Sequence, residues 1–153
     1  MSNRLSEERI IQLFNKIMPE NRLLLDDDVS GFKTNFSNIF ISSDMLVQST
    51  DIPPSMSLSQ ATRKSIVMSV SDFASKGIKA KYCNLSVGIP KSYSINDVKQ
   101  LVKGFDIALK EYEIILIGGD TNSSNELIID TTLIGFSNNK IPKRNNARDK
   151  DIV

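Results

Sequence analysis

Carboxylates and hydroxyls directly follow two short apolar runs of this sequence. Residues 114–117 lead into Gly118-Gly119-Asp120-Thr121, and residues 39–41 lead into Ser42-Ser43-Asp44. Runs that are this short and rich in β-branched residues predict buried strands. Two glycines permit a sharp turn and a close ligand approach, so we expect them to end the first strand and to present Asp120 at the rim of a sheet. A strand followed by a plain Gly-Asp turn is the alternative.

Further carboxylates come from three consecutive aspartates at positions 26–28 and from Asp72. Asp72 lies one residue from the apolar face of a predicted helix, and the alternatives are an exposed helix position for Asp72 and a solvated loop for the aspartates. Two carboxylates about 4 Å apart repel by roughly 4 kcal/mol at an effective dielectric constant of about 20. If these side chains converge, a bound Mg²⁺ is the simplest way to offset their repulsion. Mg²⁺ with few protein ligands usually also binds phosphate oxygens. Sequence spacing leaves the convergence itself open.

The composition restricts the chemistry to oxygen ligands. Histidine is absent, which removes the commonest general base and imidazole metal sites. The single cysteine, Cys83, excludes an internal disulfide and a multi-cysteine zinc site, and fits a reducing cytosol. Nineteen basic and eighteen acidic residues give a net charge of +1, so no overall field attracts nucleic acid or a membrane surface. Carboxylates and hydroxyls remain, and such hard ligands suit Mg²⁺.

The length and the hydrophobic pattern predict one cytoplasmic domain. The N-terminus is too charged for a signal peptide, and no apolar run approaches membrane-spanning length. Periodicity and capping residues predict helices over residues 6–18, 57–77 and 94–112, and strands over residues 39–41, 79–89, 114–117 and 126–136. The last strand is apolar on both faces, which predicts burial on both sides. We expect residues 31–38 to form a turn, residues 51–54 to form an extended connector, and residues 137–151 to form a solvated basic loop or an anion site.

Four segments carry a family resemblance. ISSDMLVQSTDIPPSM, VMSVSDFASKG, LIGGDTN and KRNNARDKD resemble, in order and spacing, the successive motifs of thiamine-monophosphate kinase, and STDIPP is similar to the archaeal branch. The resemblance implies an α+β domain like the N-terminal domain of aminoimidazole ribonucleotide synthetase, with a mixed sheet flanked by helices on one side. It also implies a homodimer in which edge strands complete an intersubunit barrel. The chain would then be the N-terminal ATP- and Mg²⁺-binding domain, residues 1–153, and a second domain is expected beyond it.

The resemblance also implies roles for individual residues. The implied Mg²⁺ ligands are Asp28, Ser42, Ser43, Asp44, Asp72 and Asp120. The implied ATP-binding residues are Gly119, Asp120 and Arg144, and the implied substrate-binding residue is Asp51. No catalytic residue separate from the metal ligands is implied.

The sequence departs from the family motifs at four places. Asp26 stands for the glycine of GDD, Ser69 for the asparagine of NVSD, Ser123 or Ser124 for an arginine after GGDT, and Asn145-Asn146 for the centre of RSGA. No proposed metal ligand is lost.

The implied reaction is direct in-line transfer of the ATP γ-phosphate to thiamine monophosphate, assisted by several Mg²⁺ ions, with this chain alone expected to be inactive. One alternative is a non-catalytic, dimerising Mg²⁺-nucleotide-binding module. Another is a synthetase relative of the hydrogenase-maturation or selenophosphate type.

Overall fold

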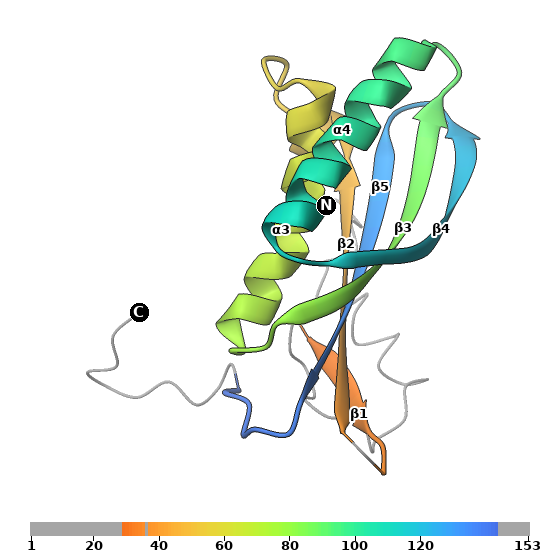
Figure 1. Cartoon of the computed structure of the whole chain (residues 1–153). Helices are drawn as coiled ribbons and strands as arrows, with labels where there is room; N and C mark the ends of the chain where they lie inside the picture. Colours follow the sequence, from red (N-terminus) through yellow and green to blue (C-terminus); the bar gives the residue numbers. More distant parts are fainter. Residues whose placement is uncertain (1–28, 36, 144–153) are drawn as a thin grey trace, which may run out of the picture.

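The computed structural model of the chain describes residues 29–35 and 37–143 (Figure 1). Within these residues, five strands and three helices follow one another as β1 Ser30–Lys33, β2 Asn38–Val47, α2 Gln48–Asp51, α3 Leu58–Ser75, β3 Ala80–Pro90, α4 Ile95–Glu111, β4 Ile115–Ser124 and β5 Ile128–Ser137. The helix predicted over residues 6–18, the aspartates at 26–28 and Arg144 lie outside the described residues.

The strands form one mixed sheet in the order β1-β2-β5-β3-β4. All neighbours are antiparallel except β3 and β4, which are parallel and joined through α4. Figure 1 shows the long helices α3 and α4 side by side on one face of this sheet. The predicted α+β class, with a mixed sheet flanked by helices on one side, is confirmed.

Capping residues set the ends of both long helices. The hydroxyl of Ser57 accepts from the Gln60 amide at the start of α3, and Ser94 and Asp97 form the predicted capping box at the start of α4. After α3 the chain turns at Gly77, whose φ of +63° lies in the left-handed region that favours glycine. These boundaries agree with the sequence prediction.

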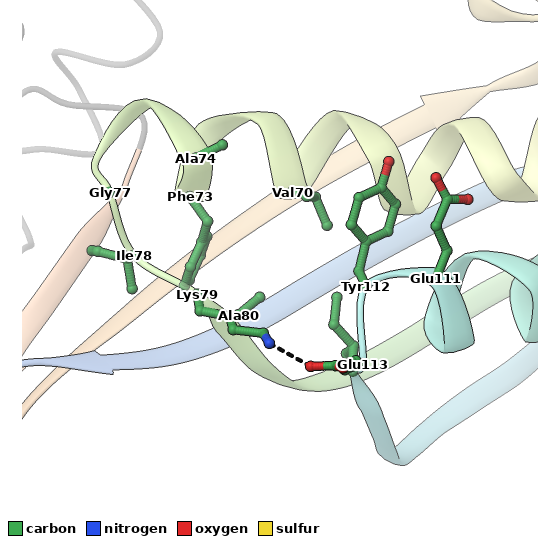
Figure 2. A pocket seen from close by; sticks show the side chains of 11 residues that line it. Val70, Phe73, Ala74, Gly77, Ile78, Lys79, Ala80, Glu111, Tyr112 and Glu113 are labelled. Atoms are coloured by element: carbon green, nitrogen blue, oxygen red, sulfur yellow. Dashed lines mark hydrogen bonds and ion pairs between the residues drawn. The ribbon is translucent and has the colours of Figure 1, made fainter.

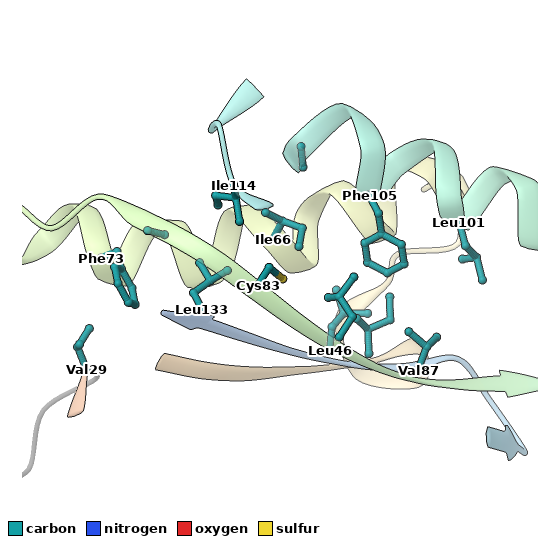
Figure 3. Close-up of a cluster of buried hydrophobic side chains, with 14 of the residues drawn as sticks. Val29, Leu46, Ile66, Phe73, Cys83, Val87, Leu101, Phe105, Ile114 and Leu133 are labelled. Carbon is teal, nitrogen blue, oxygen red and sulfur yellow. The ribbon is translucent and has the colours of Figure 1, made fainter. Parts of the chain in front are cut away.

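The hydrophobic core fills the space between the helices and one face of the sheet (Figure 3). Alternate residues of β5, among them Ile129 and Leu133, are fully buried on this face. The opposite face of β5 is only partly covered, and Phe136 is 43% exposed. The prediction that residues 126–136 are buried on both sides is therefore wrong for the chain alone, because helices cover only one face of the sheet.

The strands that carry the polar motifs are longer than predicted. β2 continues through Ser42-Ser43-Asp44, since it pairs with β5 residue by residue as far as Val47. β4 continues through both glycines to Ser124. A Cβ atom on Gly119 would lie 2.1 Å from the carbonyl oxygen of Leu85, so the glycine permits close strand pairing rather than ending the strand.

Other local predictions also need correction. Residues 114–117 do not form a buried strand, because β4 is an edge strand, and Ile117 is 57% exposed. Residues 31–38 include the end of β1, and the turn is confined to the segment where Thr34 bonds to Ser37. Asp51 ends the short helix α2, and the extended backbone begins at Ile52. Within the described ranges, none of the helices has the length and apolarity needed to cross a membrane.

Candidate metal centre

A side-chain contact between α3 and β2 joins two of the predicted site residues. The hydroxyl of Ser42 donates to Oδ2 of Asp72 at 3.2 Å, although the two residues are 30 positions apart in the chain. Ser42 is buried and Asp72 is partly buried. Asp72 is therefore not a fully exposed helix position, and its carboxylate points toward the strand that carries Ser42 and Asp44.

Asp44 lies on the same face of β2, two residues beyond Ser42, which is about 6.6 Å along a strand. Its Oδ2 atom is buried and has no hydrogen-bond partner within residues 29–35 and 37–143. A buried carboxylate oxygen without a donor or a cation is costly, so native sites rarely leave one uncompensated. Asp44 thus presents an oxygen ligand that requires a positively charged or hydrogen-donating partner.

Two further polar side chains complete this region. Thr131 is the direct partner of Asp44 in the ladder between β2 and β5, and its buried Oγ1 also lacks a hydrogen-bond partner in the described part of the chain. Ser69, one helical turn before Asp72, donates its hydroxyl to the carbonyl of Thr131 at 3.4 Å. We call these residues the polar seam: Ser42, Asp44, Ser69, Asp72 and Thr131. Its ligands are all oxygen atoms, which fits Mg²⁺.

Sequence analysis missed Thr131 as a candidate, because it lies in an apolar run that predicts only packing. The strand period places it on the buried face. Its position opposite Asp44, however, depends on the pairing register, which the sequence does not contain.

Asp120 lies away from the polar seam. Strands β5 and β3 separate β4 from β2, so the axes of these two strands are about 14 Å apart. The register pairs Asp120 with the exposed Ser86, on the face opposite to that of Leu85. Over the residues described, no group of three or more acidic or cysteine side chains is close enough to hold one ion. Two strands of the sheet therefore lie between Asp44 and Asp120.

The remaining predicted residues divide between other surfaces. Asp120 and Gly119 line a shallow hollow of about 370 Å³ beside β3 and β4. Ser43 is exposed, with its Oγ 2.5 Å from that of Thr132. The carboxylate of Asp51 accepts from the Val47 amide at 2.7 Å, and this hydrogen bond lowers the pKa of Asp51. The structure therefore joins Ser42 to Asp72 and places Asp44 on the same face of β2, and it leaves Ser43, Asp51 and Asp120 on other surfaces.

A larger hollow of about 570 Å³ contains none of the predicted site residues. Figure 2 shows it between the C-terminal half of α3 and the turn from α4 to β4, lined by Val70, Phe73 and Tyr112 among others. An exposed ion pair between Lys79 and Glu113 lies at its rim. The two carboxylates of its lining, Glu111 and Glu113, are paired with Arg63 and Lys79.

The one cysteine is unsuited to nucleophilic chemistry. Cys83 is fully buried in the core, and burial raises the pKa of its thiol to about 12. At neutral pH the thiol stays protonated, and the thiolate is the nucleophilic form.

Taken together, the observations define an α+β domain with a cluster of polar oxygen-bearing side chains between a helix and a mixed sheet. Residues 26–137 match the family described as AIR synthase related protein, N-terminal domain. The chain belongs to this family.

Named relatives match nearly the whole chain. The thiamine-monophosphate kinase of Nitrosopumilus maritimus is 40% identical over 151 residues, which are 99% of this chain and 47% of that protein. The thiamine-monophosphate kinase of Pyrococcus horikoshii is 33% identical over 150 residues, which are 98% of this chain and 48% of that protein. The predicted resemblance is confirmed, and the chain spans about half the length of these relatives.

A solved structure supports the fold independently. The structure described as AaThiL complexed with AMPPCP and TMP superimposes with a TM-score of 0.85 at 22% sequence identity. The match covers 96% of this chain and 48% of that chain. At this level of identity the likeness establishes the fold.

Proposed function

We propose that the chain is the N-terminal domain of a thiamine-monophosphate kinase, which transfers the γ-phosphate of ATP to thiamine monophosphate and yields thiamine diphosphate and ADP. The observation that carries this proposal is the 40% identity to a thiamine-monophosphate kinase over 99% of the chain. We also place the protein in the cytoplasm, where its single reduced cysteine fits.

The polar seam is the proposed Mg²⁺ site. Ser42, Asp44 and Asp72 would hold the ion, and this choice is supported by the hydrogen bond between Ser42 and Asp72 and by the position of Asp44 on the same face of β2. A bound Mg²⁺ neutralises the negative charge that develops on a transferred phosphoryl group.

Asp120 and Gly119 would contact the nucleotide phosphates together with a separate ion. Because β5 and β3 lie between β2 and β4, we assign the ion at Asp120 separately from the ion of the polar seam. The roles implied by the resemblance are kept for the remaining residues. Asp28 and Ser43 would bind metal, Arg144 would contact ATP, and Asp51 would contact the substrate.

The transfer is proposed to be direct, without a covalent phospho-enzyme. The attacking group is a phosphate oxygen that is already ionised near neutral pH, so no strong general base is required. The sequence contains no histidine, and its one thiol is buried and protonated. Catalysis then depends on holding donor and acceptor in line and on charge neutralisation.

We further propose that the domain acts as a homodimer through the uncovered side of its sheet. Large apolar side chains are exposed on the strands β1, β2, β4 and β5, namely Phe32, Met45, Ile115, Leu116, Ile117 and Phe136. Contiguous exposed apolar surface and an open edge strand such as β4 are typical of an interface. A partner subunit would cover both.

A coupled assay of ADP release with thiamine monophosphate tests the function. It compares the 153-residue chain with a version extended to the full length of the relatives. The proposal expects turnover in the extended version and none in the short chain, since about half of the relatives' length is outside it. Magnesium-nucleotide binding without turnover in the extended version would favour a non-catalytic module. Inorganic phosphate without thiamine diphosphate would favour a synthetase relative.

A further inference from the structure

Two complementary groups without partners lie opposite each other in the polar seam. Asp44 offers a buried acceptor oxygen, and Thr131 offers a buried hydroxyl that can donate one hydrogen. The two residues are paired in the antiparallel ladder between β2 and β5. Side chains at such positions have Cβ atoms about 4.5–5.5 Å apart, so a change of rotamer brings hydroxyl and carboxylate into contact.

The neighbouring hydroxyls already have acceptors. Ser42 donates to Asp72 at 3.2 Å, and Ser69 donates to the carbonyl of Thr131 at 3.4 Å. Because a serine hydroxyl carries a single hydrogen, neither can also donate to Asp44 without losing its present bond. Within the described seam, the hydroxyl of Thr131 is therefore the donor left for Asp44.

We propose that Thr131 is a positioning residue for Asp44. Its hydroxyl donates to Oδ2 from the β5 side, which fixes the carboxylate plane and leaves the other carboxylate oxygen for the ion beside Ser42 and Asp72. The inference rests on the proposed function, because it assumes that Mg²⁺ binds in the seam. It goes further in assigning a role to a residue that contacts no substrate and no metal.

The burial of Thr131 supports a specific role. The residue is 0% exposed, and valine would fill nearly the same volume without an unsatisfied hydroxyl. The fold alone therefore gives no reason for a threonine here. Hydrogen bonds that orient metal ligands typically change metal affinity by about 10- to 100-fold when they are removed.

Titration calorimetry with MgCl₂ alone, without nucleotide or thiamine phosphate, tests the proposal on the 153-residue chain. Thr131→Val is expected to weaken Mg²⁺ binding by about tenfold or more. Thr131→Ser keeps the hydroxyl and is expected to stay within about threefold of the wild type. Thr131→Cys offers a thiol, which is a weak donor, and is expected to lose affinity as well.

Thr62→Val is the matched control. Thr62 is also fully buried, but its hydroxyl already donates to the carbonyl of Leu101 at 2.9 Å, between α3 and α4. Its loss is expected to lower the melting temperature and to leave Mg²⁺ affinity unchanged. This contrast separates a positioning effect from a general loss of stability.

Wild-type Mg²⁺ affinity in Thr131→Val would overturn the inference and leave the proposed function standing. If that variant does not fold, wild-type affinity in Thr131→Cys has the same meaning. A similar loss of affinity in Thr131→Ser and Thr131→Val would also overturn it, since the hydroxyl would then not be the cause. Absence of Mg²⁺ binding in the wild type would overturn the metal site together with this inference.

Discussion

At the residue scale, the proposed chemistry depends on the two carboxylates of the polar seam. Asp72 contacts Ser42, and Asp44 has a buried oxygen that no described donor reaches. The buried oxygen of Asp44 is costly to leave without a partner, and a hydrogen donor or a cation in the polar seam would compensate for it.

Asp72→Asn tests the metal role in the version extended to the relatives' full length. The amide keeps the shape and can still accept from Ser42, but it removes the charge that is proposed to hold Mg²⁺. We expect kcat to fall by about 10²- to 10³-fold, as for the loss of one electrostatic stabiliser, without loss of stability. Asp106→Asn is the matched control, because Asp106 is exposed on α4 and pairs with Lys110, and steady-state kinetics should find it near wild type. Near-normal turnover in Asp72→Asn, or its unfolding, would contradict the assignment.

Cys83 predicts how stability changes at high pH. Its thiol has a pKa of about 12 in the folded chain, compared with about 9 in the unfolded chain. The unfolded chain therefore loses the proton first, so stability is fully present below pH 9 and declines as pH rises from about 9 toward 12, by at most about 1.4 kcal/mol per pH unit. Urea unfolding at pH 8, 9 and 10 should show this decline, and Cys83→Ala should show a shallower one. Equal slopes in the two proteins would contradict a buried, protonated thiol.

At the element scale, local sequence signals predicted the helices better than the ends of the strands. Ser57, Ser94 and Gly77 mark helix ends through contacts within four residues, which the sequence displays directly. The ends of β2 and β4 depend on pairing with distant strands. The serines and glycines inside these strands therefore predicted strand ends that the structure does not have. Thr131 could not be predicted as a candidate for the same reason, because its position opposite Asp44 depends on the strand register. Exposure of β4 could not be predicted either, because strand order is a property of the whole sheet.

Gly119→Ala tests why the glycine pair lies inside β4. A Cβ there would lie 2.1 Å from the carbonyl oxygen of Leu85, and this rigid backbone contact must open. We expect a loss of about 1–3 kcal/mol in the free energy of unfolding, measured in urea. Gly118→Ala is the control, since its Cβ would meet only the Asn84 side-chain oxygen at 3.1 Å, which can rotate away. Equal stability of the two variants would show that the close strand approach is not the reason for Gly119.

At the scale of the whole molecule, one face of the described sheet is covered by helices and the other face is open. Helices α3 and α4 cover the first, and the second exposes apolar side chains such as Met45 and Phe136. The chain spans about half the length of the relatives it matches, and the proposed homodimer would cover the second face.

Ile117→Lys tests the proposed homodimer. The side chain is 57% exposed on the edge strand β4, and a buried lysine at an apolar interface is strongly unfavourable. Sedimentation velocity should find the wild type dimeric and this variant monomeric. Ile95→Lys, at an even more exposed position on α4, should remain dimeric. A monomeric wild type, or a dimeric Ile117→Lys, would argue against this interface.

The position of the bound metal tests the central claim most directly. Crystals of the chain grown with Mn²⁺ in place of Mg²⁺ can be measured for anomalous scattering, which locates the ion without reference to the protein coordinates. We predict a peak between α3 and β2, within coordination distance of carboxylate oxygens from both Asp44 and Asp72. An anomalous map with ions only elsewhere, for example at Asp120 alone, would contradict a metal centre in the polar seam.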